Sequence, residues 1–224
     1  MIGYIGEGES MGKAVIFDLD GTLINTENGI LKSINFVLNE MGLEGIDKCN
    51  QKKFIGPPIY MSLQNFYGLD IKVALEGHNK FRQVYEEKYL YDAFLYDNIR
   101  NVLRELCNKN YKLGVATYKK EEHAVNLLKY FSLYQYFDVV KGSNSNNNLT
   151  KTSIVSNCIF DLGISYGESD IILIGDSYSD FKAASDNKID FLGVTYGFGF
   201  NKESNDLNNI NYVETPMEIL DYIG

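Results

Sequence analysis

The sequence predicts an α/β protein in which a doubly wound parallel sheet, of the Rossmann-like kind, carries an inserted helical domain. Short apolar runs bounded by polar turns recur along the chain, and amphipathic segments separate the later runs. Roughly ninety residues separate the first run from the second, whereas a crossover between parallel strands needs only about a dozen or more. The excess predicts an insertion after the first strand.

The predicted elements alternate in chain order. Strands are expected at residues 14–17, 113–116, 139–140, 171–174 and 191–194. Helices, recognised by apolar residues three or four apart, are expected at residues 98–108, 121–131, 152–162, 179–187 and 216–223. Alternation of this kind builds a parallel sheet with helices on both faces.

The long interval between the first two strands lacks a strand pattern and shows helical periodicity instead. One apolar face is formed by Leu31, Ile34, Leu38 and Met41, and part of another by Phe81, Val84, Tyr85 and Tyr89. We therefore predict a core domain of residues 1–25 and 93–224, and a helical cap domain of residues 26–92 over the carboxyl edge of the sheet.

Composition narrows the class of protein. The 224 residues carry a formal net charge of −9 and are 45% hydrophobic, which fits a globular protein and opposes binding to nucleic acid, since that needs a basic surface. No apolar run reaches membrane-spanning length. The three cysteines are far apart and odd in number, a spacing that suggests neither a disulfide framework nor a zinc site. A protein of the reducing cytoplasm is therefore expected. Met11 would make a natural start, and residues 1–10 are read as either native or an extension.

Two carboxylates follow the first strand directly, at Asp18 and Asp20. Along an extended chain such residues point to the same side, roughly 6–7 Å apart, so both can approach one phosphate. They would repel it unless a cation such as Mg²⁺, which prefers carboxylate oxygens, lay among them. Gly21 then allows a sharp turn whose backbone N–H groups can face the phosphate. The alternative is an ordinary strand end and turn.

Polar residues also follow the later strands. Thr117 ends the second strand, and a helix opening at Tyr118 and Lys119 would offer backbone N–H groups to an anion. The alternative is that Thr117 is an ordinary N-cap.

Two further sites follow along the chain. Lys151 lies near a helix start, where a cation is unfavourable without an anionic partner; the alternative is that Lys151 is a solvated surface lysine. Asp176 follows the strand at 171–174, and Asp180 lies four residues on.

These residues together resemble the four motifs of the haloacid dehalogenase superfamily of phosphatases. Asp18 to Thr22 is similar to the first motif, Thr117 to the second, Lys151 to the third and Gly175 to Asp180 to the fourth. Three further segments are similar to one branch of this superfamily, the phosphoglycolate phosphatase-like branch: residues 54–58, residues 115–117 with Lys119, and residues 193–199. The departures from its pattern are Asn25, Tyr118 and Thr152.

The resemblance implies a Mg²⁺-dependent phosphatase. Asp18 would be the nucleophile that forms an aspartyl-phosphate, and Asp20 the general acid and base. The Asp18 carboxylate, the Asp20 backbone carbonyl and Asp176 would hold Mg²⁺, with Asp180 as an outer partner. Thr117 and Lys151 would bind the phosphoryl oxygens.

The expected substrate is a small phosphate ester whose leaving group faces the cap, where Lys52, Lys53, Tyr60, His78 and Arg82 are candidate contacts. Two alternatives stay open. A phosphosugar mutase would return the phosphoryl group to the substrate, and a phosphate-ligand binding protein would keep the fold without turnover. The protein is expected to be a monomer or a homodimer.

Overall fold

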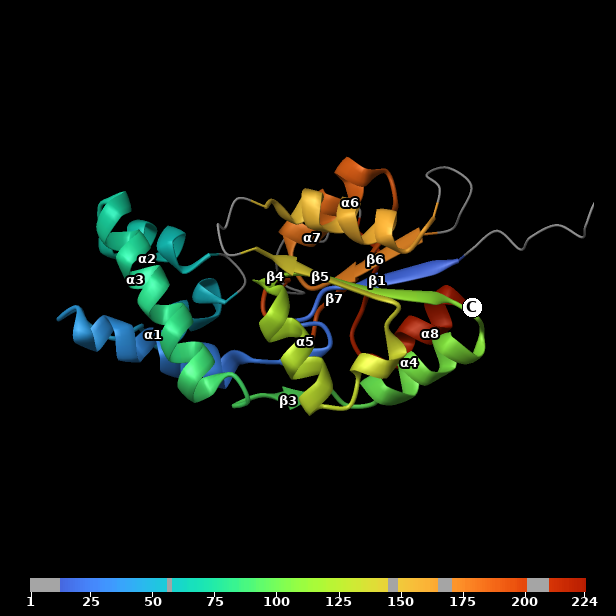
Figure 1. Ribbon diagram of the computed structural model, residues 1–224, viewed down its shortest axis with the longest axis horizontal. Coiled ribbons are helices and arrows are strands. Elements are labelled where there is room, and N and C mark those ends of the chain that lie inside the picture. The colour runs from blue at the N-terminus through green and yellow to red at the C-terminus, as the bar shows by residue number, and fades with distance from the viewer. Residues whose placement is uncertain (1–12, 56–57, 145–148, 165–170, 201–209) are drawn as a thin grey trace, which may run out of the picture.

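A six-stranded parallel sheet forms the centre of the molecule in the computed structural model (Figure 1). The structure describes residues 13–55, 58–144, 149–164, 171–200 and 210–224. The strand order is β5-β4-β1-β6-β7-β8. The strands are β1 (Ala14–Phe17), β4 (Lys112–Lys120), β5 (Val139–Ser143), β6 (Ile171–Gly175), β7 (Asp190–Val194) and β8 (Tyr212–Val213).

Helices cover both faces of this sheet, which confirms the predicted architecture (Figure 1). The side chains of β1 alternate between the faces: Ala14 and Ile16 pack toward α6 and α7, whereas Val15 and Phe17 pack toward α4, α5 and α8. All four are fully buried, as expected for a central parallel strand. The core helices are α4 (Ile99–Asn108), α5 (Glu121–Tyr130), α6 (Lys151–Asp161), α7 (Tyr178–Asn187) and α8 (Glu218–Ile223), with a 3₁₀ turn at Tyr134–Tyr136.

One expectation at the sheet edge was wrong. Thr117 was expected to end its strand, with a helix opening at Tyr118, but β4 continues to Lys120 and α5 begins only at Glu121. The reason is the neighbouring strand, because β5 pairs with β4 again at Ser143 and Lys120 after a shift in register. Tyr118 and Lys119 are therefore extended residues, whose side chains point to opposite sides of the sheet edge.

A helical insertion, hereafter the cap, lies beyond the carboxyl edge of the sheet (Figure 1). Ile34 and Leu38 are buried in it as predicted, while Leu31 and Met41 are partly exposed. The cap consists of α1 (Glu27–Glu40), a 3₁₀ segment (Lys48–Phe54), α2 (Ile59–Tyr67), α3 (Ile71–Val84) and a π-helical turn (Tyr85–Tyr89). The domain boundaries at 25/26 and 92/93 stay predictions.

The chain enters and leaves the cap through a two-stranded antiparallel ribbon. Its strands are β2 (Ile24–Asn25) and β3 (Phe94–Leu95). Asp92 connects the segment that leaves the cap to α1. Its carbonyl accepts a hydrogen bond from the Gly29 N–H at 3.0 Å, and its carboxylate forms an ion pair with Lys32 at 2.5 Å. Two adjacent crossings give a short joint between cap and core, as hinged domains have.

Among the described residues, we find no helix with the length and apolar character needed to cross a membrane.

Candidate active site at the carboxyl edge of the sheet

Asp18 lies directly after the central strand β1 and is 7% exposed. Its backbone N–H donates to the Ile174 carbonyl of β6 at 2.8 Å, which fixes the residue to the sheet. Its Oδ1 atom accepts a hydrogen bond from the Lys151 ammonium at 2.5 Å. The same ammonium lies 2.7 Å from Oδ1 of Asp180. Two carboxylates from different elements therefore share one buried lysine.

Asp176, the third acid, follows β6 and is also buried. Its Oδ2 atom accepts hydrogen bonds from the backbone N–H groups of Phe198 at 2.7 Å and Gly199 at 3.2 Å. One oxygen from each of Asp18, Asp176 and Asp180 lies within 4.8 Å of the others. The fold therefore brings together three of the four predicted acids.

Gly21 is required where the chain turns over this cluster. Its φ of +89° lies in the left-handed region, and a Cβ atom there would overlap the Asp176 carboxylate. Backbone and carboxylate can approach this closely only because the residue is glycine.

The electrostatics of the cluster reflect the burial of its charged groups first and their excess of negative charge second. Burial raises the pKa of Asp18 to about 7 although Lys151 opposes the shift, and the charge of Asp180 adds to it. Burial likewise raises the pKa of Asp176 well above its ordinary value, and Asp18 and Asp180 raise it further. Burial disfavours the charged form of Lys151, but Asp18 and Asp180 outweigh it and hold the lysine's pKa above its ordinary value. The pKa values of the acids rise because burial and neighbouring carboxylates disfavour their charged forms, and that of Lys151 rises because two carboxylates contact its ammonium.

Asp180 also shapes the helix on which it stands. Its Oδ2 atom accepts hydrogen bonds from the Ser177 N–H at 3.1 Å and the Ser177 hydroxyl at 2.6 Å, within a capping box at the start of α7. Its other oxygen is left to face Lys151. Asp180 therefore holds Lys151 in place while fixing its own helix.

Lys151 was expected near a helix start, and it is the first residue of α6. Thr150 caps this helix by accepting from the Ser153 N–H at 3.2 Å. The Tyr118 hydroxyl accepts a hydrogen bond from the Lys151 N–H at 3.0 Å. Sequence reasoning flagged Tyr118 only as an unusual residue, and its contact with Lys151 depends on the extension of β4.

Asp20 belongs to a second group of residues. Its Oδ1 atom accepts a hydrogen bond from the Thr26 hydroxyl at 2.6 Å and forms an ion pair with Lys119 at 3.0 Å. Burial disfavours the charged form of Lys119, but Asp20 and Tyr85 outweigh it and raise the lysine's pKa. From the sequence, Lys119 was expected at the start of a helix and within a motif, so its contact with Asp20 was missed, as was that of Thr26.

Thr117 is 1% exposed on β4, next to the central strand. The register pairs Phe17 with Val115, so Asp18 and Thr117 both lie just beyond the paired residues. The Thr117 hydroxyl oxygen accepts a hydrogen bond from the Lys119 N–H at 3.1 Å. Its own proton remains available for an acceptor at this edge.

Three residues near the end of α3 reach from the cap to the core. Arg82 donates to the Ser143 hydroxyl at 3.1 Å. The Tyr85 hydroxyl accepts from Lys119 at 3.1 Å. Glu86 lies 3.1 Å from Nε2 of His123.

The other candidate contacts of the cap have partners within the cap or are not described. His78 is buried against the Tyr60 ring, and burial, with the charge of Arg82, lowers the pKa of His78 to about 4. Lys53 bonds Asn50, and the side chain of Lys52 lies outside the described residues.

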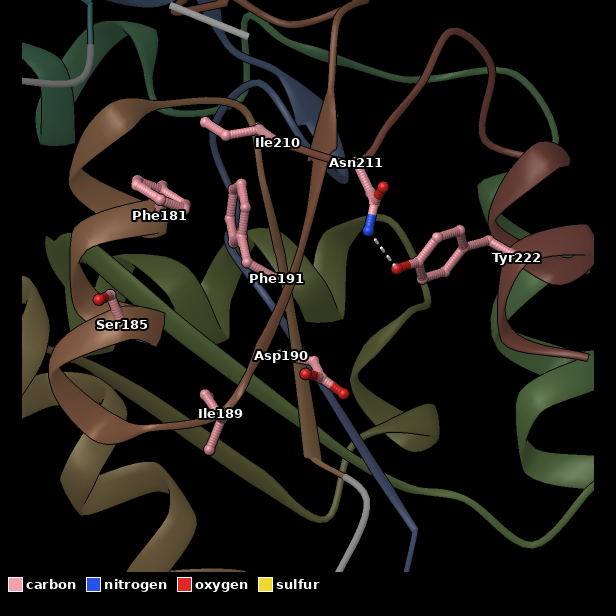
Figure 2. A pocket seen from close by; sticks show the side chains of 8 residues that line it. All are labelled: Phe181, Ser185, Ile189, Asp190, Phe191, Ile210, Asn211 and Tyr222. Carbon is pink, nitrogen blue, oxygen red and sulfur yellow. Dashed lines mark hydrogen bonds between the residues drawn. The ribbon is translucent and has the colours of Figure 1, made fainter. Parts of the chain in front are cut away.

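A hollow of about 310 Å³ lies elsewhere on the core, beside β7 and between α7 and α8 (Figure 2). It contains none of the predicted site residues. The Asn211 amide on its wall donates to the Tyr222 hydroxyl at 2.9 Å. The residues lining it are Phe181, Ser185, Ile189, Asp190, Phe191, Ile210, Asn211 and Tyr222.

Comparison with known proteins agrees with this geometry. A family model described as haloacid dehalogenase-like hydrolase matches residues 15–194, which include all the acids of the site. The chain belongs to this hydrolase family. A 5′-nucleotidase of Pseudomonas aeruginosa is 31% identical over 84% of the chain and 85% of its own length. The tyrosine-protein kinase PtkA of Mycobacterium tuberculosis is 30% identical over 86% of the chain and 65% of its own length.

A solved structure has the same arrangement of core and insertion. The crystal structure of a predicted phosphatase from Clostridium acetobutylicum superposes with a TM-score of 0.87 and 32% identity, over 96% of this hydrolase and 99% of that chain. The superposition covers the cap as well as the sheet, so the helical insertion is shared between the two proteins.

Proposed function

We propose that this family member is a phosphatase that hydrolyses a small phosphomonoester through an aspartyl-phosphate on Asp18. The observation that carries the proposal is the placement of Asp18, a buried carboxylate at the end of the central strand, 2.5 Å from the Lys151 ammonium. A carboxylate fixed by a sheet and oriented by a cation is suited to attack phosphorus. Asp20 follows two residues later, so an acid is available beside the nucleophile.

The donor set fits a divalent cation. Asp18, Asp176 and Asp180 offer three buried carboxylates against the one ammonium that lies among them in the described part of the chain. Hard oxygen donors of this kind suit Mg²⁺. The ion would be held by Asp18, Asp176 and the Asp20 backbone carbonyl. Asp180 would not bind the ion directly but would orient the groups around it, through Lys151 and the residues next to it. Bound Mg²⁺ would neutralise this charge and polarise the phosphate oxygens.

The first half of the reaction forms a bond between an Asp18 oxygen and phosphorus. The bond from phosphorus to the leaving oxygen breaks, its electron pair stays on that oxygen, and Asp20 supplies a proton there. Lys151, the Thr117 hydroxyl and the N–H groups around Gly21 would hold the phosphoryl oxygens while charge moves onto them.

The second half returns the enzyme to its starting state. Asp20, now a carboxylate, takes a proton from a water molecule whose oxygen attacks phosphorus. The bond between Asp18 and phosphorus breaks, its electron pair returns to the carboxylate, and inorganic phosphate leaves. The cap would exclude water from the site during the first half and admit the attacking water molecule for the second.

The leaving group would lie between these acids and the cap. Arg82 and Tyr85 already contact the core there, so they are the cap residues best placed to meet it. The motif resemblance favours a small phosphate ester of the phosphoglycolate type, and the 5′-nucleotidase relative makes nucleotides the first substrates to compare.

The test is release of inorganic phosphate from phosphoglycolate, sugar phosphates, nucleoside monophosphates and pyrophosphate, with and without Mg²⁺. Metal-dependent release that disappears in Asp18→Asn is the expected result. Isomerisation of a hexose phosphate without net release would favour the mutase instead. Binding of the same compounds without release, at saturating Mg²⁺, would contradict any catalytic role.

A further inference from the structure

Lys119 joins the candidate acid to the cap. Its side chain is 7% exposed, and its ammonium lies 3.0 Å from Oδ1 of Asp20 and 3.1 Å from the Tyr85 hydroxyl oxygen. The ammonium also lies 4.5 Å from the centroid of the Tyr85 ring. Asp20 stands on the core and Tyr85 on the cap, so one side chain connects the two parts of the molecule.

The contacts of Lys119 are of the kind that a buried cation requires. Asp20 supplies the opposite charge, the Tyr85 hydroxyl supplies a neutral acceptor, and the ring face supplies a cation–π contact. Losing one of them would leave the ammonium under-coordinated in a site with little water. The position of Lys119 is thus set jointly by a core carboxylate and a cap phenol.

These contacts also orient Asp20. Lys119 and the Thr26 hydroxyl both approach Oδ1 of Asp20, at 3.0 and 2.6 Å. Two donors on one oxygen fix the plane of the carboxyl group and leave Oδ2 as the oxygen that can exchange a proton with the leaving group. A general acid works only when that oxygen lies within hydrogen-bond reach of its target.

We propose that Lys119 is a positioning residue for Asp20, and that Tyr85 holds Lys119 in its working position when the cap is closed. The proposal rests on the phosphatase function proposed above. Lys119 itself touches neither phosphorus nor the leaving oxygen; it acts through the orientation of Asp20. The connection makes proton delivery depend on a cap residue that lies 34 positions from Lys119 in the sequence.

The test uses the different needs of two leaving groups. An alkyl phosphate expels an alkoxide that must be protonated, whereas 4-nitrophenyl phosphate expels a stable phenolate. The quantity to measure is kcat/KM, because it reports only the steps through formation of the aspartyl-phosphate. The variants are Lys119→Met, which keeps an unbranched chain, and Tyr85→Phe, which keeps the ring and removes only the hydroxyl.

In Lys119→Met, we expect kcat/KM to fall about 10²-fold for the alkyl phosphate and no more than about threefold for 4-nitrophenyl phosphate, since loss of general acid assistance costs about 10²–10⁴-fold. In Tyr85→Phe, we expect the same preference with a smaller loss, about tenfold for the alkyl ester, because one hydrogen bond to a charged group is lost. The matched controls are Lys120→Met and Tyr89→Phe, which should leave the ratio between the two substrates unchanged. Lys120 pairs with the exposed Glu122 instead.

Equal losses for both substrates in Lys119→Met and Tyr85→Phe would overturn the positioning role, because a merely structural defect does not distinguish leaving groups. If Lys119→Met does not fold, Tyr85→Phe alone decides. Failure of the wild-type protein to release phosphate from either ester would instead refute the phosphatase function, so the two failures are distinguishable.

Discussion

Two buried lysines pair with aspartates at the same edge of the sheet, and their surroundings differ. Lys151 contacts Asp18 and Asp180, and all three belong to the core. Lys119 contacts Asp20 of the core and Tyr85 of the cap. The first group keeps its contacts wherever the cap lies, whereas the second loses the contact between Lys119 and Tyr85 when the cap moves away from the core.

The difference separates two requirements of the proposed reaction. The nucleophile must be ready when substrate enters, so a fixed arrangement within the core suits it. The acid is needed only after the site has closed, so a link to the cap suits it. The five predictions below test this division, beginning with the largest expected effect.

Asp18→Asn tests the core group at its centre. We expect phosphate release to fall more than about 10³-fold, because an amide is a poor nucleophile and the loss of a nucleophile is among the most severe active-site defects. The protein should stay folded, since Lys151 keeps Asp180 as a partner. Steady-state phosphate release and thermal unfolding check both statements, and retained turnover would remove Asp18 from its role.

Lys151→Met tests how strongly the core group depends on its cation. Without Mg²⁺ at pH 7, we expect the free energy of unfolding to fall by about 3–5 kcal/mol, because removing one partner leaves buried carboxylates uncompensated. The matched control is Lys141→Met. Lys141 also lies 2.5 Å from a carboxylate, that of Asp161, but this pair is partly exposed to solvent, so the expected loss is below about 1 kcal/mol.

Chemical denaturation of both variants would measure these losses. Similar losses in Lys151→Met and Lys141→Met would mean that burial of the acidic cluster does not matter to stability.

The pH dependence of stability tests the charge excess directly. The pKa of Asp18 is raised to about 7 in the folded protein from 3.8, so the folded state binds more protons than the unfolded state between these values. Stability of the metal-free protein should therefore fall as pH rises through this window. The slope should be shallower in Asp18→Asn, measured by denaturation at pH 5 and pH 7.

Mg²⁺ gives the complementary measurement, because it would neutralise the carboxylates that become charged at higher pH. It should raise the melting temperature more at pH 7 than at pH 5. An equal rise at both pH values would argue against an ion bound among these acids.

Arg82→Gln tests the cap side, where the smallest effect is expected. Arg82 is partly buried and donates to Ser143, and burial lowers its pKa. If it also meets an anionic leaving group, its removal should raise KM about tenfold for phosphoglycolate, with kcat little changed. KM for 4-nitrophenyl phosphate should move less. Lys80 lies on the same helix as Arg82 and forms an exposed pair with Glu40 of α1, so Lys80→Gln should change neither value.

The sequence by itself determined the sheet, the helices around it and the acids of the core group. An apolar run followed by a polar residue indicates where a buried strand ends, and parallel strands bring their carboxyl ends to one edge. Asp18 and Asp176, with Asp180 four residues further on, could therefore be predicted to meet from local patterns alone, whereas Lys151 was joined to them by the family resemblance. The short strands β2, β3 and β8 were missed, because two residues are too few to show a period.

Only the tertiary structure decided the partners of Lys119, Tyr118 and Tyr85. The extension of β4 depends on pairing with β5, and that pairing determines where Tyr118 and Lys119 point. The contact between Lys119 and Tyr85 depends on how the cap packs against the core. Hydrophobic periodicity shows which face of a helix is buried, but not which polar residue across a domain boundary that face will meet, because the choice is made by packing between segments distant in the chain.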